Sequence, residues 1–173
     1  MTKEKVRGFE VVADKFKMSG YDVPIPVKAT RNSAGYDFVV PIDVDIPPQT
    51  MAIFSTDIKA YMQPDEVLLM FPRSSTGIRH NLEISNTVVV GDADFYENEY
   101  NDGNYKIALW NRSPAWVFVK HDTVPELVDL TERNTVHLKA GDRVVQGIFF
   151  KTLPADGGAS DAVRTGGIGS TGR

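Results

Sequence analysis

The residues Glu66-Val67-Leu68-Leu69-Met70-Phe71 form an apolar run of strand length, and Pro72-Arg73-Ser74-Ser75-Thr76-Gly77 follows it directly. Comparable runs, dense in β-branched and aromatic residues, recur along the whole chain between Pro, Gly, Asn and Asp, and none keeps a helical period for long. Many short strands joined by tight turns are typical of a β-barrel or a β-sandwich. The sequence therefore predicts an all-β fold.

The expected elements follow from these runs. Strands are predicted at Gly8–Ala13, Asp37–Ile42, Gln49–Tyr61, Glu66–Phe71, Glu83–Ser85, Tyr105–Asn111, Ala115–Lys120, Thr135–Leu138 and Arg143–Thr152. One short helix is predicted between Val124 and Arg133, because Pro125 can occupy its first turn and Leu127, Val128 and Leu130 would give it an apolar face.

The composition limits the class of protein. A chain of 173 residues, 42% of them hydrophobic, fits one domain with its own core. No apolar run approaches the roughly 18 residues of a membrane helix, and the polar N-terminus has no apolar stretch behind it, so we expect a cytoplasmic protein that does not bind membranes. Without cysteine there is no disulfide or thiolate nucleophile. A net charge of −4 argues against non-specific binding of nucleic acid.

The last 19 residues differ in composition from the rest. They hold 6 of the 14 glycines and too little apolar surface for a core strand, so we expect a mobile tail until a ligand orders it. The run Gly166-Gly167-Ile168-Gly169-Ser170-Thr171-Gly172 offers backbone N–H groups and two hydroxyls that can wrap a phosphate. It lacks the Gly-Lys-Ser/Thr of a P-loop, and taken alone it also fits a flexible solubilising tail.

Two further segments place polar groups at strand ends. Pro72–Gly77 offers one guanidinium and three hydroxyls, which suit phosphate oxygens, although an ordinary polar turn has the same composition. Asp92 and Asp94 follow the apolar run Val88-Val89-Val90. An acid in that place can take a proton from water, coordinate a cation or cap a turn.

Five segments, taken together and in order, resemble the five motifs of the trimeric deoxyuridine triphosphatase (dUTPase) family. They are Ala34-Gly35-Tyr36-Asp37, Pro72-Arg73-Ser74-Ser75, Asn86 through Gly103, Gly141-Asp142-Arg143 with Gln146, and Arg164 through Gly172. The resemblance implies a distorted β-barrel, or jelly roll, that forms a homotrimer with active sites at subunit interfaces. It also implies a barrel domain at 1–154 and a C-terminal arm at 155–173 that closes over a neighbouring subunit's site.

The activity implied by the resemblance is hydrolysis of dUTP to dUMP and pyrophosphate with Mg²⁺. Asp92 would be the general base that deprotonates a water for attack on the α-phosphorus, and Asp37 would hold a water of the metal ion. Substrate contacts would come from Arg73, Ser74, Ser75 and Gln146 at the phosphates, from the hairpin residues Asn86, Gly91 and Phe95 at the base and sugar, and from Arg164, Ile168, Gly169, Ser170 and Thr171 of the arm.

The chain departs from the family's pattern at several positions. Phe95 stands where Tyr is usual, so a phenol hydrogen bond is lost unless Tyr96 supplies it. Gly91 replaces a branched aliphatic residue and Ile168 replaces Phe. About 20 residues near 115–133 are additional, and an insertion of this kind is tolerated on a surface. A similar segment in phage-encoded relatives can bind a protein, so a regulator docking there, in the cytoplasm of a bacterial host, is the alternative.

Two other functions compete with dUTP hydrolysis. dCTP deaminase shares the barrel, the trimer and the Arg-Ser-Ser segment, but it uses a glutamate on the strand after the hairpin, where this chain has Ile107-Ala108-Leu109-Trp110. Deamination is therefore disfavoured. The second alternative is a catalytically silent, nucleotide-responsive regulatory protein of the same fold. The presence of Asp92, Ser74 and Gln146 argues against silence, though not against a second role.

Overall fold

The computed structural model describes residues 5–120, 126–158 and 164, and short strands dominate it. This agrees with the predicted all-β fold. The strands are β1 (Gly8–Val11), β2 (Val27–Lys28), β3 (Tyr36–Val39), β4 (Val44–Ile46), β5 (Met51–Ser55), β6 (Ile58–Tyr61), β7 (Glu66–Pro72), β8 (Leu82–Ile84), β9 (Val89–Asp92), β10 (Lys106–Asn111), β11 (Trp116–Val119), β12 (Glu126–Asp129), β13 (Val136–Leu138) and β14 (Arg143–Lys151). The helical elements are single turns: η1 (Asp14–Phe16), η2 (Ser75–Arg79), η3 (Ala93–Phe95) and α1 (Thr131–Asn134).

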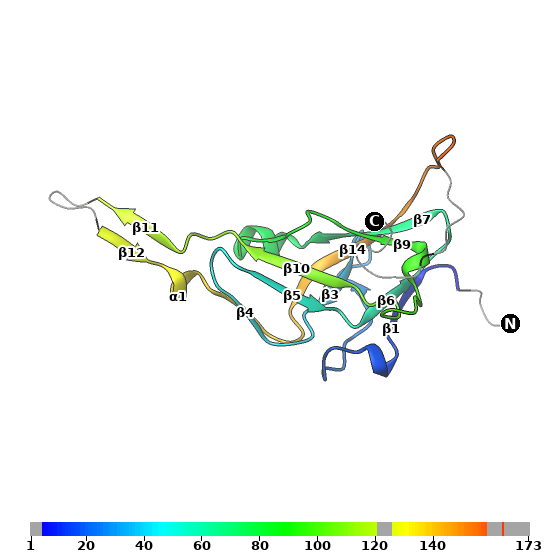
Figure 1. The fold of residues 1–173 in the computed structure, drawn as a ribbon, viewed down its shortest axis with the longest axis horizontal. Coiled ribbons are helices and arrows are strands. Elements are labelled where there is room, and N and C mark those ends of the chain that lie inside the picture. Colours follow the sequence, from blue (N-terminus) through cyan, green and yellow to red (C-terminus); the bar gives the residue numbers. More distant parts are fainter. Residues whose placement is uncertain (1–4, 121–125, 159–163, 165–173) are drawn as a thin grey trace.

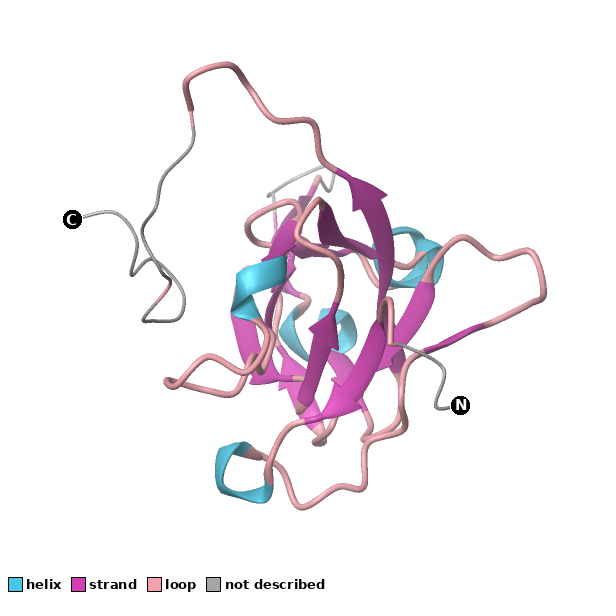
Figure 2. Ribbon diagram, turned by 90° about the vertical axis from the view of Figure 1, so that its right-hand side faces the viewer, coloured by secondary structure: helices cyan, strands magenta, loops and turns pink. Residues whose placement is uncertain are grey.

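The strands pair in antiparallel sheets. The largest sheet has the order β2-β3-β14-β7-β9, the next has the order β5-β10-β8, and the remaining pairs are β1-β6, β13-β4 and β11-β12. Apart from β11 and β12, these strands wrap around a shared interior in the jelly-roll manner (Figure 2). The hairpin of β11 and β12 extends away from this body (Figure 1).

Alternation along β7 shows how the sequence builds the interior. Leu68 and Met70 are fully buried, whereas Leu69 between them is only partly buried, as the period of two in a strand requires. β14 pairs with β7 over seven positions, from Val145 opposite Pro72 to Lys151 opposite Glu66. The two longest strands therefore form the centre of the large sheet.

An aromatic cluster joins the β1-β6 pair to the large sheet. The ring centre of Phe9 lies 5.3 Å from those of Tyr36, Phe38 and Phe149. Edge-to-face and tilted contacts of this kind stabilise beyond the area that they bury. The N-terminal strand is thus part of the same core as β3 and β14.

Most of the predicted strands are present, but Gln49–Tyr61 is two strands rather than one. The chain turns between β5 and β6 at Asp57, whose φ is 56°. The Asp57 carboxylate is fully buried and accepts hydrogen bonds from the N–H groups of Met18 and Ser19 at 2.9 and 3.0 Å. The short strands β2, β4 and β9 are formed by segments in which the sequence predicts no strand.

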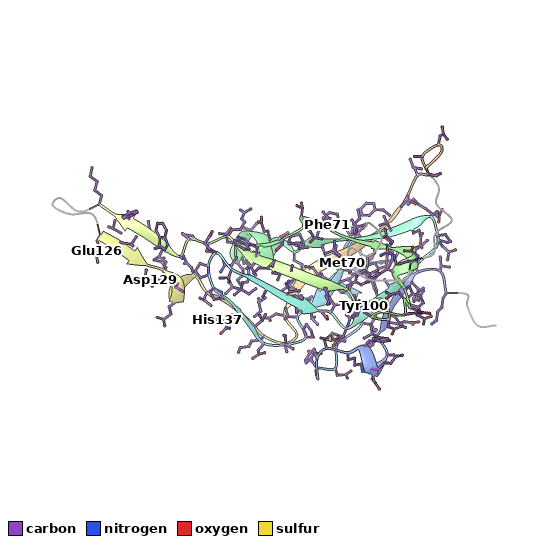
Figure 3. The ribbon with its side chains drawn as sticks, viewed as in Figure 1. Met70, Phe71, Tyr100, Glu126, Asp129 and His137 are labelled. Atoms are coloured by element: carbon purple, nitrogen blue, oxygen red, sulfur yellow. The ribbon has the colours of Figure 1, made fainter. Side chains whose placement is uncertain are left out.

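The predicted helix at Val124–Arg133 is wrong over most of its described part. Glu126–Asp129 is strand β12, paired with β11, and only Thr131–Asn134 is helical. Because the hairpin projects from the body, an apolar helix face there would have nothing to pack on, whereas pairing with β11 satisfies the peptide groups. Glu126 and Asp129 mark this hairpin in Figure 3, far from Met70 and Phe71 in the body. Val124 and Pro125 lie outside the described residues.

A buried charged pair anchors the loop before β10. Lys59 Nζ lies 3.1 Å from both Asp102 Oδ1 and Glu97 Oε1, and the side chains of Lys59 and Asp102 are 8% and 11% exposed. Asp102 also accepts a hydrogen bond from the N–H of Ala13 at 2.7 Å. The network therefore ties strand β6, this loop and the N-terminal segment together.

Replacing Lys59 with Met should lower the free energy of unfolding by about 3 kcal/mol, because Asp102 would stay buried without its counter-charge. Urea unfolding followed by circular dichroism measures this change. Lys139→Met is the matched control, because Lys139 and its partner Asp43 are 70% and 60% exposed. This variant should lower the free energy of unfolding by less than about 1 kcal/mol. Equal losses in the two variants would contradict the prediction.

Candidate active site

Strand register brings three of the predicted site residues to one end of the large sheet. Asp37 of β3 lies opposite Gln146 of β14, and Gln146 lies opposite Phe71 of β7. Arg73 follows directly after β7, which ends at Pro72. Three motifs that are far apart in the sequence therefore meet at this corner, which we call the Arg73 end.

Asp37 lies between two guanidinium groups at the Arg73 end. Its Oδ1 is 3.0 Å from Arg73 Nε, its Oδ2 is 3.3 Å from Arg143 Nη1, and its side chain is 6% exposed. Arg73 Nη1 also donates to the carbonyl oxygen of Arg143 at 3.3 Å. Two cations around one carboxylate leave a net positive charge, and the carboxylate holds the guanidinium of Arg73 in one orientation, as the binding of a polyanion requires.

The turn that follows Arg73 presents hydroxyl groups. Ser74 is exposed and Ser75 is partly buried, and the turn is fixed because Thr76 Oγ1 donates to the carbonyl oxygen of Val144 at 2.7 Å. A cavity of about 280 Å³ opens here. Its lining consists of Ala29, Ser33, Gly35, Asp37, Arg73, Ser74, Ser75 and Gln146.

Gly35 is required by the close packing of this corner. A Cβ at position 35 would lie 2.7 Å from Gln146 Oε1 and 2.8 Å from Gln146 Cβ, which is closer than side chains approach. Gln146 Nε2 donates to the carbonyl oxygen of Pro72 at 3.4 Å. Glycine in the first motif therefore leaves room for the glutamine of the fourth.

Asp92 lies at the other end of the large sheet, which we call the Asp92 end. It is the last residue of β9 and pairs with Val67 near the start of β7. Its side chain is 51% exposed, beside a cavity of about 700 Å³. This cavity is lined by Met62, Pro64, Glu66, Val67, Val90, Asp92, Ala93, Asp94, Thr152 and Arg164.

Arg164 reaches the Asp92 end and bonds both of its acids. Its Nη2 donates to Asp92 Oδ2, its Nε donates to Asp94 Oδ1 at 2.8 Å, and its Cζ lies 5.8 Å from the ring centre of Phe95. In this single chain the arginine of the fifth motif thus contacts the predicted base rather than the Arg73 end.

The two ends are too far apart to act on one phosphorus atom. Asp92 pairs with Val67 of β7, and Arg73 follows Val67 by six residues along the same extended segment. At ~3.3 Å per residue, Asp92 and Arg73 are therefore about 20 Å apart. The cavities beside them share no lining residue. We call the two ends half-sites, because one chain does not bring them together.

The remaining predicted positions lie around β9. Phe95 is 7% exposed, and its ring centre lies 5.1 Å from that of Tyr105. Tyr96 O–H donates to Glu10 Oε2 at 2.7 Å, and burial together with this carboxylate raises the pKa of Tyr96. Tyr96 therefore does not replace the phenol that Phe95 lacks. Asn86 is exposed in the turn between β8 and β9.

Some predicted positions cannot be placed, and some residues of the site carry no predicted role. Ile168, Gly169, Ser170 and Thr171 lie outside the described residues. Arg143 and Asp94 lie within the five motifs, so the motif spacing alone indicates that they are near the site. Tyr105 belongs to no motif, and only the structure reveals its place under Gly91 and Phe95.

Neither a membrane-spanning helix nor a metal-binding cluster occurs in the described ranges. No helix in them is long and apolar enough to cross a membrane. No group of three or more His, Cys, Asp or Glu side chains in them is arranged to hold a metal ion.

Comparison with known proteins identifies the class to which this fold and these half-sites belong. Residues 21–123 match the dUTPase family model. A deoxyuridine 5'-triphosphate nucleotidohydrolase of Lactococcus lactis is 38% identical over 170 residues, covering 97% of this chain and 99% of that protein. The crystal structure of the Streptococcus mutans dUTPase is similar at a TM-score of 0.66 and 33% identity, covering 87% of this chain and 99% of that one.

Phage proteins share the fold at lower identity. A mutant of the dUTPase of Staphylococcus bacteriophage 80alpha, one of the phage dUTPases that control transfer of virulence genes, matches at a TM-score of 0.62 and 17% identity, covering 93% of this chain and 99% of that one. A mutant of the dUTPase from phage phi11 of S. aureus, in which a structural Mg(II) ion is coordinated, matches at a TM-score of 0.61 and 20% identity. The match covers 91% of this chain and 97% of that one. The class is thus nucleotide hydrolases of the jelly-roll type. This chain belongs to the dUTPase family.

Proposed function

We propose that the chain is a dUTP diphosphatase, which hydrolyses dUTP to dUMP and pyrophosphate. The observation that carries the proposal is the Arg73 end, where an ion-paired guanidinium, two serine hydroxyls and the Gln146 amide surround one cavity. Such donors suit phosphate oxygens. Membership of the family, and the name of the Lactococcus lactis relative, supply the substrate.

Asp92 is assigned as the general base. A carboxylate that is half exposed beside a roomy cavity can hold a water and accept its proton. The oxygen of that water attacks the α-phosphorus, the bond to the bridging oxygen breaks, and pyrophosphate leaves. Arg164 donates to the Asp92 carboxylate, so a triphosphate that competes for this guanidinium would release the base.

The phosphates are assigned to the Arg73 end. Arg73 is already fixed by Asp37, so its charge needs little reorganisation when the triphosphate arrives. Ser74 would donate toward the leaving bridging oxygen, with Ser75 and Gln146 on the other phosphate oxygens. Asn86, Gly91 and Phe95 are assigned to base and sugar selection, and residues 155–173, with Ile168, Gly169, Ser170 and Thr171, to the closing arm.

Mg²⁺ is expected to arrive with the substrate. The described residues offer no cluster of carboxylates or histidines for a resident ion, which fits a metal held mainly by phosphate oxygens. Both oxygens of Asp37 face guanidinium groups, so this residue could hold only a metal-bound water through its remaining lone pairs. When bound, the ion would neutralise phosphate charge.

The separation of the half-sites supports active sites at the interfaces between chains, and the family resemblance supplies the homotrimer. Because about 20 Å lies between Asp92 and Arg73 in one chain, one nucleotide can meet both only if a second chain supplies the other half. Cyclic symmetry then completes every site in the same way. The cytoplasm of a bacterial host stays the predicted location.

A second candidate role concerns the β11-β12 hairpin. Trp116, Phe118 and Leu127 are 56%, 67% and 56% exposed, which is unusual for large apolar residues on one small hairpin. We propose that this surface binds a protein regulator, as an addition to catalysis. One competing hypothesis is that the whole protein is regulatory and has no catalytic activity. Another is that the hairpin is a surface insertion that binds nothing.

Pyrophosphate release from dUTP, dCTP, dTTP and UTP with Mg²⁺ tests the proposed activity. We expect release from dUTP alone and a fall of about 10²–10⁴-fold in Asp92→Asn, which keeps the shape of the side chain but cannot accept the proton. Release that survives in Asp92→Asn would remove the base assignment. A folded protein that acts on none of the four nucleotides would favour the regulatory hypothesis.

Mixing two inactive variants tests whether the site is shared between chains. Asp92→Asn and Arg73→Gln should each be inactive, whereas oligomers refolded from an equal mixture should recover about a quarter of the wild-type rate, because random assembly joins an intact Asp92 to an intact Arg73 in that share of interface sites. Each variant refolded alone is the control. A mixture that stays inactive would place both residues of a site on one chain.

Removing the hairpin tests its role. The N–H of Leu130 donates to the carbonyl oxygen of Ala115 at 2.7 Å, so residues 116–129 can be replaced by an Asn-Gly turn without moving the ends. We expect dUTP hydrolysis to be unchanged, within about twofold, and binding of a regulator to be lost. Trp116→Ser with Phe118→Ser is the milder matched variant. Loss of hydrolysis in both would make the segment structural for the enzyme.

A further inference from the structure

Tyr105 has a buried hydroxyl that the fold does not use. The residue is 3% exposed. Among the described residues, Tyr105 Oη is the one buried side-chain oxygen or nitrogen that has no hydrogen-bond partner. An unpaired buried hydroxyl costs folding free energy that phenylalanine would not cost. The group is therefore a candidate for a function beyond packing.

Gly91 makes room for this hydroxyl directly before the predicted base. A Cβ at position 91 would lie 2.5 Å from Tyr105 Oη and 2.7 Å from its Cε1. Gly91 is buried and Asp92, its neighbour in β9, is exposed. The phenol of Tyr105 therefore fills the space of the side chain that β9 lacks, beneath the backbone that carries Asp92.

The same ring supports Phe95. The ring centres of Tyr105 and Phe95 lie 5.1 Å apart at 43°, and Phe95 in turn contacts the guanidinium of Arg164. Gly91 and Phe95 flank Asp92 in the sequence. Tyr105 touches both, so one side chain occupies the space left at 91 and stands behind the ring at 95.

The charged groups around Asp92 determine what the hydroxyl can do. Arg164 bonds Asp92 in the free chain, Asp94 lies on the other side of that arginine, and Glu66 lines the same cavity while it is paired with Arg7. Burial and the nearby charge of Asp92 raise the pKa of Tyr105. The phenol thus keeps its proton and can only be a donor to a carboxylate.

We propose that Tyr105 is a positioning residue for Asp92, and that its O–H donates to the Asp92 carboxylate in the nucleotide-bound enzyme, once Arg164 has left that carboxylate. The proposal rests on the proposed hydrolysis of dUTP. A donor to the ionised base holds it in place and favours its charged form. Phe95 keeps its orientation through the ring of Tyr105, with or without the hydroxyl.

The test is Tyr105→Phe, which removes one oxygen and keeps the ring. We expect kcat for dUTP to fall about tenfold, and the acidic limb of the kcat profile to move about one unit to higher pH, because the base loses a donor to its charged form. The acidic limb of kcat/KM should not move, since it reports the free enzyme, in which the hydroxyl has no partner. The melting temperature should stay the same or rise.

Tyr96→Phe is the matched control, because its hydroxyl is bonded to Glu10 instead. It should lower the melting temperature and leave both pH profiles unchanged. An unchanged kcat profile in Tyr105→Phe would overturn the proposal. A lower melting temperature with an unshifted limb would also overturn it, since that result describes a purely structural residue. If the wild type fails to hydrolyse dUTP, no profile exists and the proposed function itself has failed.

Discussion

The pairing of β7 with β14 is the interaction on which the rest of the molecule depends. These strands run side by side over seven register positions, from Val145 opposite Pro72 to Lys151 opposite Glu66, and their inward residues form the centre of the core. β3 adds to the outer edge of β14, and β9 to the outer edge of β7. A slip of one residue would turn every inward side chain outward, so the core fixes the register. That register in turn fixes which functional residues become neighbours.

The length of β7 has a consequence for function. Arg73 follows its C-terminal end and Asp92 lies beside its N-terminal end, so the strand separates the proposed phosphate-binding groups from the proposed base. On the proposed function, oligomerisation is then part of catalysis, because no rearrangement short of breaking the large sheet could unite the two ends of one chain. Each end can keep a stable structure of its own, and the reacting geometry exists only where two chains meet.

Sequence patterns predict the long elements and the motifs well, and predict poorly whatever depends on contacts across strands. β7 and β14 are apolar runs that are typical of buried strands. The close contact of Gly35 with Gln146 explains why the first motif has a glycine where the fourth has a glutamine. The residues Leu127 and Val128 fit a helix or a strand equally well, and the absence of any surface for a helix to pack on decides between them. Tyr105 carries no signal at all, since its contact with Gly91 joins two segments that belong to different sheets.

The two ends also differ in how far they are organised before a ligand binds. At the Arg73 end the carboxylate of Asp37 is paired on both oxygens and the following turn is bonded to β14, so this end is preorganised. At the Asp92 end Arg164 bonds Asp92 and Asp94, and the buried hydroxyl of Tyr105 has no partner among the described residues. On the proposed function, reorganisation on binding would therefore be concentrated at Asp92, where the proton is transferred. Electrostatic groups that stay fixed need no reorganisation at the moment of reaction. On the proposed function, the ion pair with Arg164 would keep Asp92 from acting as a base until a triphosphate competes for that guanidinium.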